Sequence, residues 1–205
     1  MSLESIVKEA WVVGKTIDLA GIQFGPGFSG WQDKGFVPGP VPYYYFLAGL
    51  VRSQSCNRIL EIGTHFGGSA LSMLRGIVDP AKAKLITVDI SDSNAALHGM
   101  AGVTKLTGDA NGETVIRNVV DRFDGSPIDL MFVDADHSFS ATALSLGAYG
   151  MLLRPRLVVL DDIAFNEGMQ ALWSRLRVSY EAVNCSDIVP AIRIKECGFG
   201  LMRLR

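Results

Sequence analysis

Short apolar runs alternate with longer amphipathic stretches from residue 57 to the end of the chain. The apolar runs, which are typical of buried strands, span residues 58–62, 85–90, 103–108, 128–133 and 156–162. Between them, apolar residues recur at helical spacing over residues 68–78, 94–100, 110–123, 138–153 and 166–179. Strands that alternate with crossover helices predict a parallel sheet covered by helices on both faces.

Two further strand candidates, residues 180–183 and 198–204, follow the last predicted helix, with no helical pattern between them. We expect them to form an antiparallel hairpin on the parallel sheet. The predicted fold is an α/β domain with a doubly wound, mostly parallel sheet of seven strands and an antiparallel C-terminal strand. We expect this domain to span residues 57–205.

Residues 1–56 have a different pattern, which begins with a predicted helix over residues 3–15. Residues 21–42, here called the arm, contain six glycines and four prolines and therefore predict irregular structure. The arm also carries Phe24, Phe28, Trp31 and Phe36 and leads into Tyr43, Tyr44 and Tyr45. Two interpretations stay open: a segment packed on the core or on a partner subunit of a homo-oligomer, or a lid over a substrate pocket.

Composition excludes several classes of protein. An apolar content of 48% is enough for a core, and a net charge of -2 without a basic patch argues against nucleic acid and anionic membranes as partners. The apolar stretch 41–51 is eleven residues long, far short of a membrane span. The N-terminus lacks the features of a secretory signal, and the three cysteines are not spaced for disulfides or zinc. We expect a cytoplasmic protein.

The most informative local motif is a glycine-rich turn between the first predicted strand and the next helix. It reads Glu61-Ile-Gly63-Thr64-His65-Phe-Gly67-Gly68-Ser69. Glycines let the backbone approach a ligand, and the start of the helix offers free N–H groups. Asp89 ends the next strand, where an acid can bind the ribose hydroxyls of a nucleoside. Asp109 follows the third strand, where an adenine amino group could lie.

The turn differs from that of a dinucleotide site. The dinucleotide pattern G-x-G-x-x-G would need glycine at His65, and an acid at Glu61 would repel phosphate but suits a cationic ligand. With Asp89, the pattern E-x-G-x-x-x-G resembles class I S-adenosylmethionine-dependent methyltransferases, which have a Rossmann-like fold. The resemblance covers residues 57–205. It implies that the cofactor is bound by Glu61, Gly63, Thr64, Gly67, Gly68, Ser69, Asp89, Asp109 and Asp134.

Ionisable side chains gather after the fourth and fifth strands: Asp134, Asp136 and His137, then Asp161 and Asp162. The carboxyl ends of parallel strands meet at one edge, so we expect these groups to converge. Close carboxylates repel one another unless they are protonated, paired with a base or bridged by a cation such as Mg²⁺. The alternative is that the acids cap the following helices. His137 could accept a proton from a substrate hydroxyl, or could be a solvated first-turn residue.

The same residues narrow the resemblance. D-A-D-H after the fourth strand and an acid pair after the fifth are similar to metal-dependent O-methyltransferases that act on catechols and caffeoyl thioesters, and closer to macrolide-sugar O-methyltransferases. GTHFGGSAL is similar to the first motif of cephalosporin hydroxylase-like relatives. This implies that Asp134, Asp161 and Asp162 bind a divalent metal such as Mg²⁺ and that His137 is the base. Asp162 replaces the usual Asn, which adds a negative charge.

The expected function is transfer of a methyl group from S-adenosylmethionine to a hydroxyl of a small molecule, a phenol or a sugar, with metal assistance. Two rival functions come from other classes. One is a nicotinamide-dependent oxidoreductase, which His65 and the lack of a Tyr-x-x-x-Lys pair disfavour. The other is a non-catalytic S-adenosylmethionine-binding protein.

Overall fold

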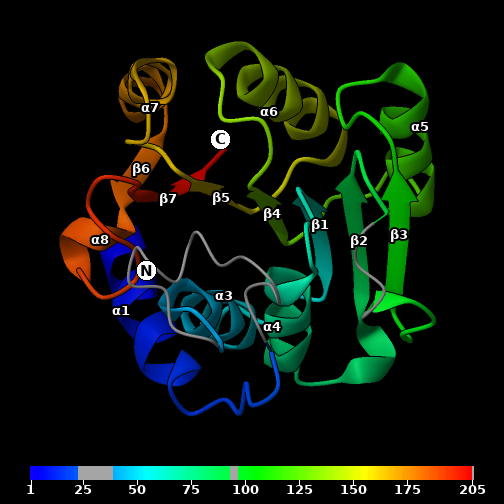
Figure 1. Ribbon diagram of the computed structural model, residues 1–205, viewed down its shortest axis with the longest axis horizontal. Coiled ribbons are helices and arrows are strands. Elements are labelled where there is room, and N and C mark those ends of the chain that lie inside the picture. Colours follow the sequence, from blue (N-terminus) through cyan, green and yellow to red (C-terminus); the bar gives the residue numbers. More distant parts are fainter. Residues whose placement is uncertain (23–38, 93–96, 205) are drawn as a thin grey trace.

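A seven-stranded sheet forms the centre of the molecule (Figure 1). The computed structural model describes residues 1–22, 39–92 and 97–204. The strands are β1 (Arg58–Ile62), β2 (Lys84–Asp89), β3 (Val103–Thr107), β4 (Leu130–Val133), β5 (Leu157–Asp161), β6 (Glu181–Asn184) and β7 (Phe199–Arg203). Their order across the sheet is β3-β2-β1-β4-β5-β7-β6. The first five strands pair in parallel, and β7 is antiparallel to both β5 and β6.

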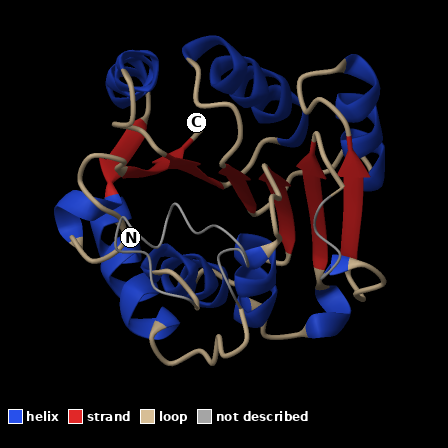
Figure 2. Ribbon diagram, in the orientation of Figure 1, coloured by secondary structure: helices blue, strands red, loops and turns tan. Residues whose placement is uncertain are grey.

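Helices cover both faces of this sheet, as Figure 2 shows. One layer is formed by α1 (Leu3–Gly14), α3 (Pro42–Ser53), α4 (Gly68–Gly76) and the short α8 (Cys185–Ile188). The other layer is formed by α5 (Glu113–Arg122), α6 (Phe139–Leu153) and α7 (Glu167–Ser179), and a short 3-10 helix, η1 (Pro80–Lys82), precedes β2. The apolar residues form one core cluster on each face of the sheet. The predicted fold class, a doubly wound and mostly parallel sheet of seven strands, is confirmed.

Three local predictions differ from the structure. The segment between β6 and β7, expected to be without helix, contains α8, whose start is capped by Asn184 Oδ1 accepting from the N–H of Ser186 at 3.1 Å. Four residues are too short to show a helical period. Residues 97–100, expected to end a helix, form no α-helix, and Gly99 has a left-handed φ of +71°. The third difference is α3, which the sequence pattern did not separate from the arm.

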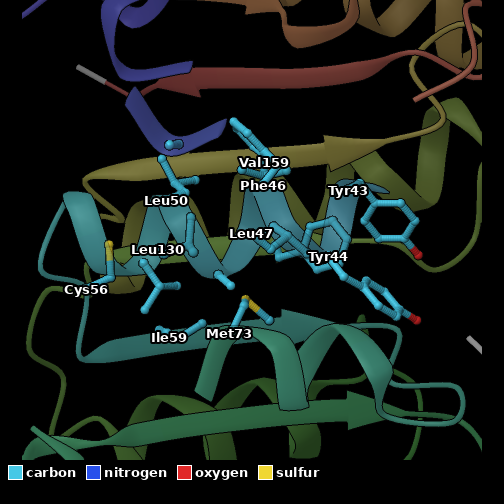
Figure 3. Packing of buried hydrophobic residues seen from close by; sticks show 14 of the residues in the cluster. Tyr43, Tyr44, Phe46, Leu47, Leu50, Cys56, Ile59, Met73, Leu130 and Val159 are labelled. Carbon is cyan, nitrogen blue, oxygen red and sulfur yellow. The ribbon is translucent and has the colours of Figure 1, made fainter. Parts of the chain in front are cut away.

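Helix α3 lies in the core, between the sheet, α1 and α4 (Figure 3). Eight of its twelve residues are buried, so it shows no polar face from which a helical period could be read. Glycines allow α1 and α3 to cross closely: a Cβ at Gly14 would lie 1.9 Å from the carbonyl oxygen of Tyr45, and one at Gly49 would lie 1.8 Å from that of Ala10. The described part of residues 1–56 therefore shares one core cluster with the sheet.

Most of the arm lies outside the described residues, so the expectation of a lid or a packing segment is not tested at Phe24, Phe28, Trp31 and Phe36. The three cysteines are all described, and none forms a disulfide. In the part of the chain that the structure describes, no helix has both the length and the apolar character needed to cross a bilayer.

Candidate active site

One cavity of about 620 Å³ opens at the carboxyl ends of β1, β2, β4 and β5. Its size falls in the range of ligand-binding pockets. Most of the predicted site residues line it: Gly63, Thr64, Gly68, Ser69, Asp89, Asp109, Asp134, Asp136, His137, Asp161 and Asp162. Glu61 and Gly67 are not among the lining residues. The structure thus brings the glycine turn and the acidic cluster to one site.

The glycine turn between β1 and α4 requires its glycines for two reasons. Gly63 has φ +92°, and a Cβ there would lie 1.7 Å from the carbonyl oxygen of Asp134. A Cβ at Gly68 would lie 2.4 Å from the hydroxyl oxygen of Tyr44. Gly67, at φ +84°, is the N-cap residue of α4. Glycine at Gly63 and Gly68 therefore lets the turn pack closely against the end of β4 and against Tyr44 of α3.

Asp89 holds this turn in place. Its Oδ2 accepts hydrogen bonds from the backbone N–H groups of Thr64 and His65, both at 2.8 Å. Its Oδ1 accepts from the N–H and the hydroxyl of Ser91, at 2.9 and 3.2 Å. Partial burial raises the pKa of Asp89, but the hydrogen bonds outweigh it and hold the pKa below its usual value. A charged carboxylate at the end of β2 is thus fixed at the edge of the cavity.

Glu61 lies behind the cavity wall and is 0% exposed. Its two carboxylate oxygens accept hydrogen bonds from the hydroxyls of Ser69 and Thr87, both at 2.5 Å. Burial raises the pKa of Glu61 to about 8, although these hydrogen bonds oppose the shift. Glu61 thus links β1, β2 and the first turn of α4, and the cofactor contact that the resemblance implies for it stays a prediction.

Asp109 and Asn111 line the end of the cavity beyond β3. Asp109 Oδ1 accepts from the N–H of Asn111 at 2.9 Å, and the Asn111 amide oxygen accepts from the Ser145 hydroxyl at 2.9 Å. The Asp109 carboxylate is thus oriented by its own loop. Asn111 and Ser145 were not singled out from the sequence, because each is a lone polar residue at a loop end or on a helix.

The far end of the cavity holds an ion pair that was not predicted. Arg193, in the segment between α8 and β7, is only 8% exposed. Its Nε and Nη2 donate to the two oxygens of Asp161 at 3.0 and 2.9 Å, and Nη2 also donates to Asp162 Oδ1 at 3.0 Å. The guanidinium carbon lies 5.0 Å from the centre of the Tyr43 ring. Bidentate bonds and an aromatic neighbour fix the plane of the guanidinium.

His137 lies between two of these carboxylates. Its Nε2 is 3.3 Å from Asp134 Oδ1 and 3.6 Å from Asp162 Oδ2. Nε2 is buried and forms no well-shaped hydrogen bond with any described residue. Burial lowers the pKa of His137, but Asp134 and Asp162 outweigh burial and the charge of Arg193, so the pKa lies above its usual value.

The acids do not act as helix caps. The N-cap of α6 is Ser138, whose hydroxyl accepts from the N–H of Ala141 at 3.3 Å. The N-cap of α7 is Asn166, whose side chain accepts from the N–H of Met169 at 2.9 Å. Asp134, which lines the cavity, is therefore free of that structural role.

The expected metal site of Asp134, Asp161 and Asp162 does not fit this arrangement. Among residues 1–22, 39–92 and 97–204, no group of three or more His, Cys, Asp or Glu side chains is arranged to hold a metal ion. Both oxygens of Asp161 already accept from Arg193. A divalent cation on this acid pair would lie beside the guanidinium charge and would be repelled by it. In the structure these two acids are therefore paired with a base, Arg193.

Tyr43 and Tyr44 also line the cavity. Both lie in the first turn of α3, as Figure 3 shows. Their rings lie 4.8 Å apart, edge to face. From the sequence they were counted with the aromatic residues of the arm. The structure instead places both tyrosines on α3, a helix of the core, which fixes the position of this part of the cavity wall.

Comparisons with known proteins agree with this geometry. A family model described as a methyltransferase domain matches residues 60–163, half of the chain. The search of curated proteins found no sequence that matches the chain. The fold is similar to that of an O-methyltransferase from Bacillus cereus in complex with S-adenosylhomocysteine, with a TM-score of 0.56, 19% identity, and coverage of 98% of this chain and 91% of that one.

Two further structures show the same fold. One is the O-methyltransferase TomG from Streptomyces achromogenes in complex with S-adenosylmethionine, with a TM-score of 0.59, 21% identity, and coverage of 97% and 89% of the two chains. The other is the methyltransferase PaMTH1 from Podospora anserina, with a TM-score of 0.61, 17% identity, and coverage of 100% and 90%. From the family match and the motifs of its glycine turn, the chain belongs to the methyltransferase domain family and is a class I S-adenosylmethionine-dependent methyltransferase.

Proposed function

We propose that the chain transfers the methyl group of S-adenosylmethionine to a hydroxyl oxygen of a small molecule. One observation carries the proposal: the glycine turn with Asp89 and the cluster of His137 with Asp134 line the same cavity. A cofactor bound at the turn would thus have a proton acceptor in the same enclosed space. The O-methyltransferases that share the fold are consistent with oxygen as the acceptor atom.

The residues at the turn fit the cofactor. Gly63 and Gly68 let the turn pack against Asp134 and Tyr44, where a Cβ would clash, and the cavity beside the turn reaches Asp89 and Asp109. Asp89 would bind the ribose hydroxyls by exchanging its bonds to Ser91, while its bonds to Thr64 and His65 keep the turn in place. S-adenosylmethionine supplies an electrophilic methyl group on a positively charged sulfur. Asp134 would attract that charge from the middle of the cavity.

His137 is proposed as the base. Its buried Nε2 faces Asp134 and Asp162 at 3.3 and 3.6 Å without a well-shaped hydrogen bond to either, which is the gap that a substrate hydroxyl would fill. In the reaction the acceptor O–H bond breaks and its proton goes to Nε2. The acceptor oxygen forms the new bond to the methyl carbon as the carbon–sulfur bond breaks toward sulfur. The products are a methyl ether, S-adenosylhomocysteine and protonated His137.

The proposal assigns no step to a divalent metal, because the acid pair is held by Arg193. The proposal includes a cytoplasmic setting, which the unpaired thiols support.

The proposal also gives different roles to the two parts of the chain. Residues 57–205 would bind the cofactor, and Tyr43 and Tyr44, from residues 1–56, would border the acceptor, because both line the cavity. No nucleic acid or membrane partner is proposed, given the net charge of -2.

The proposal is tested by a methyl-transfer screen over phenols, sugars and hydroxy acids. Product should form with wild type, and His137→Gln should remove most of it while binding S-adenosylmethionine with unchanged affinity. Calorimetry with S-adenosylmethionine and with a nicotinamide dinucleotide tests the oxidoreductase alternative, since only the first should bind. A chain that binds the cofactor but methylates no acceptor class would instead favour the non-catalytic alternative.

A further inference from the structure

Arg193 can do more than pair with two acids, because the N–H groups on its Nη1 are not used in those pairs. A guanidinium has five N–H groups. Three of them, on Nε and Nη2, donate to Asp161 and Asp162. The two on Nη1 have no partner among the residues that the structure describes. Arg193 lines the cavity, so the guanidinium that carries these two donors borders the space where an acceptor would bind.

The charges of the site favour a single fixed cation. Asp161 is 2% exposed, and a carboxylate so buried needs a partner. Arg193 supplies it. Burial lowers the pKa of Arg193, but Asp161, Tyr43 and Asp162 raise it by more and keep the guanidinium charged. Stacked on Tyr43, the guanidinium is held in one orientation before any ligand arrives.

We propose that Arg193 takes the place of a divalent cation in this site, and that its Nη1 binds the acceptor oxygen. The N–H groups would stabilise the negative charge that develops on this oxygen as its proton passes to His137 Nε2. The role in catalysis rests on the proposed function, whereas the replacement of the metal does not. The family match ends at residue 163, so it does not include Arg193.

The test combines metal binding with turnover. Mn²⁺ binding, followed by electron paramagnetic resonance, is measured on wild type, Arg193→Met and a control, Arg203→Met, each saturated with S-adenosylhomocysteine. Arg203 also pairs with a carboxylate, Glu181 at 2.7 Å, but does not line the cavity. Wild type and the control should bind no Mn²⁺ in the millimolar range. Arg193→Met should gain binding, because Asp134, Asp161 and Asp162 would then share no fixed cation.

Turnover is measured in excess chelator with an acceptor found in the screen. Wild type and Arg203→Met should keep full activity, and Arg193→Met should lose about 10²–10³-fold, the usual loss for one oxyanion donor. Since Arg193→Met leaves a buried acid unpaired and can unfold, Arg193→Met/Asp161→Asn removes that charge as well. It should fold, by its thermal melting curve, and still show the loss.

Wild type that binds Mn²⁺ and loses its turnover in chelator would overturn the proposal. So would a folded double variant with turnover within threefold of wild type. If wild type methylates nothing, the proposed function fails, and the Mn²⁺ titration alone then decides whether Arg193 occupies the position of the metal.

Discussion

Asp89 is the residue on which the geometry of the cofactor end depends, because one carboxylate oxygen holds two N–H groups of the turn. Asp89→Ala should weaken S-adenosylmethionine binding by about 1–3 kcal/mol, since a charged hydrogen-bond acceptor is lost. Calorimetry measures this. Asp124→Ala, which removes an exposed partner of Lys84 far from the cavity, is the control and should bind normally. Unchanged affinity in Asp89→Ala would remove this acid from the cofactor site.

Glu61 should make the protein less stable as the pH rises. Its pKa is about 8 in the folded chain and 4.5 ordinarily. Below the lower value both states are protonated. Between the two values only the unfolded chain ionises, so stability falls with pH, by about 1.4 kcal/mol per unit. Glu61→Gln should lack this part of the slope, as urea unfolding at pH 5.5, 6.5 and 7.5 would show. Equal slopes in both proteins would mean that Glu61 is ionised when folded.

His137 should control the pH profile of turnover. The base form must be unprotonated, so the rate should rise with pH through a pKa above the ordinary 6.5. The groups that face the ring act in both directions, with Asp134 and Asp162 raising the pKa and Arg193 lowering it. His137→Gln should lose about 10²–10⁴-fold in turnover and this inflection with it. The same inflection in the variant would assign the titration to another group.

Single residues were predictable where topology brings them together. Parallel strands meet at one edge at their carboxyl ends, where Asp134 and His137 follow β4, Asp161 ends β5 and Asp162 follows it. The fold also brings Arg193 to this edge. It lies shortly before β7, which is antiparallel to β5, so its segment arrives where β5 ends. The sequence pattern lacks a signal for that pairing, because a lone arginine in a loop has no period.

At the scale of elements, the crossing of α1 and α3 fixes the helix that carries Tyr43 and Tyr44. Gly49→Ala should destabilise the fold by about 3 kcal/mol, because its Cβ would press on the backbone of α1. Gly147→Ala on α6 is the matched control. A Cβ at Gly147 meets nothing within 4 Å, so that variant should gain about 1 kcal/mol from helix propensity. Urea unfolding compares the two, and equal effects would contradict the close crossing.

The elements most accurately predicted are those with a clear period. The strand β1 was predicted at its observed bounds, and α6 and α7 to within one residue at their starts. By contrast, α3 is buried almost all round, and its Pro42 start follows a glycine- and proline-rich segment. A helix without a polar face has no amphipathic signal, so burial by neighbours, which only the fold reveals, was needed to find it.

At the scale of the whole molecule, the order of strands in the sheet brings motifs that are far apart in the sequence to one cavity. Strands β1, β2, β4 and β5 lie within one continuous parallel block, so residues from Gly63 to Asp162 reach a single cavity. The fold class and this edge were predictable from the alternation of strands and helices. The partner of the acid pair was not, since it depends on the antiparallel return of β7.

Methyl transfer with [methyl-¹³C]S-adenosylmethionine tests the central claim most directly. Wild type is incubated in excess chelator with the pool of phenols, sugars and hydroxy acids, and the products are identified by ¹³C nuclear magnetic resonance. We predict a labelled methyl group on oxygen, with one S-adenosylhomocysteine formed for each methyl ether. A label on nitrogen, carbon or sulfur, or product only when a divalent metal is restored, would contradict the account.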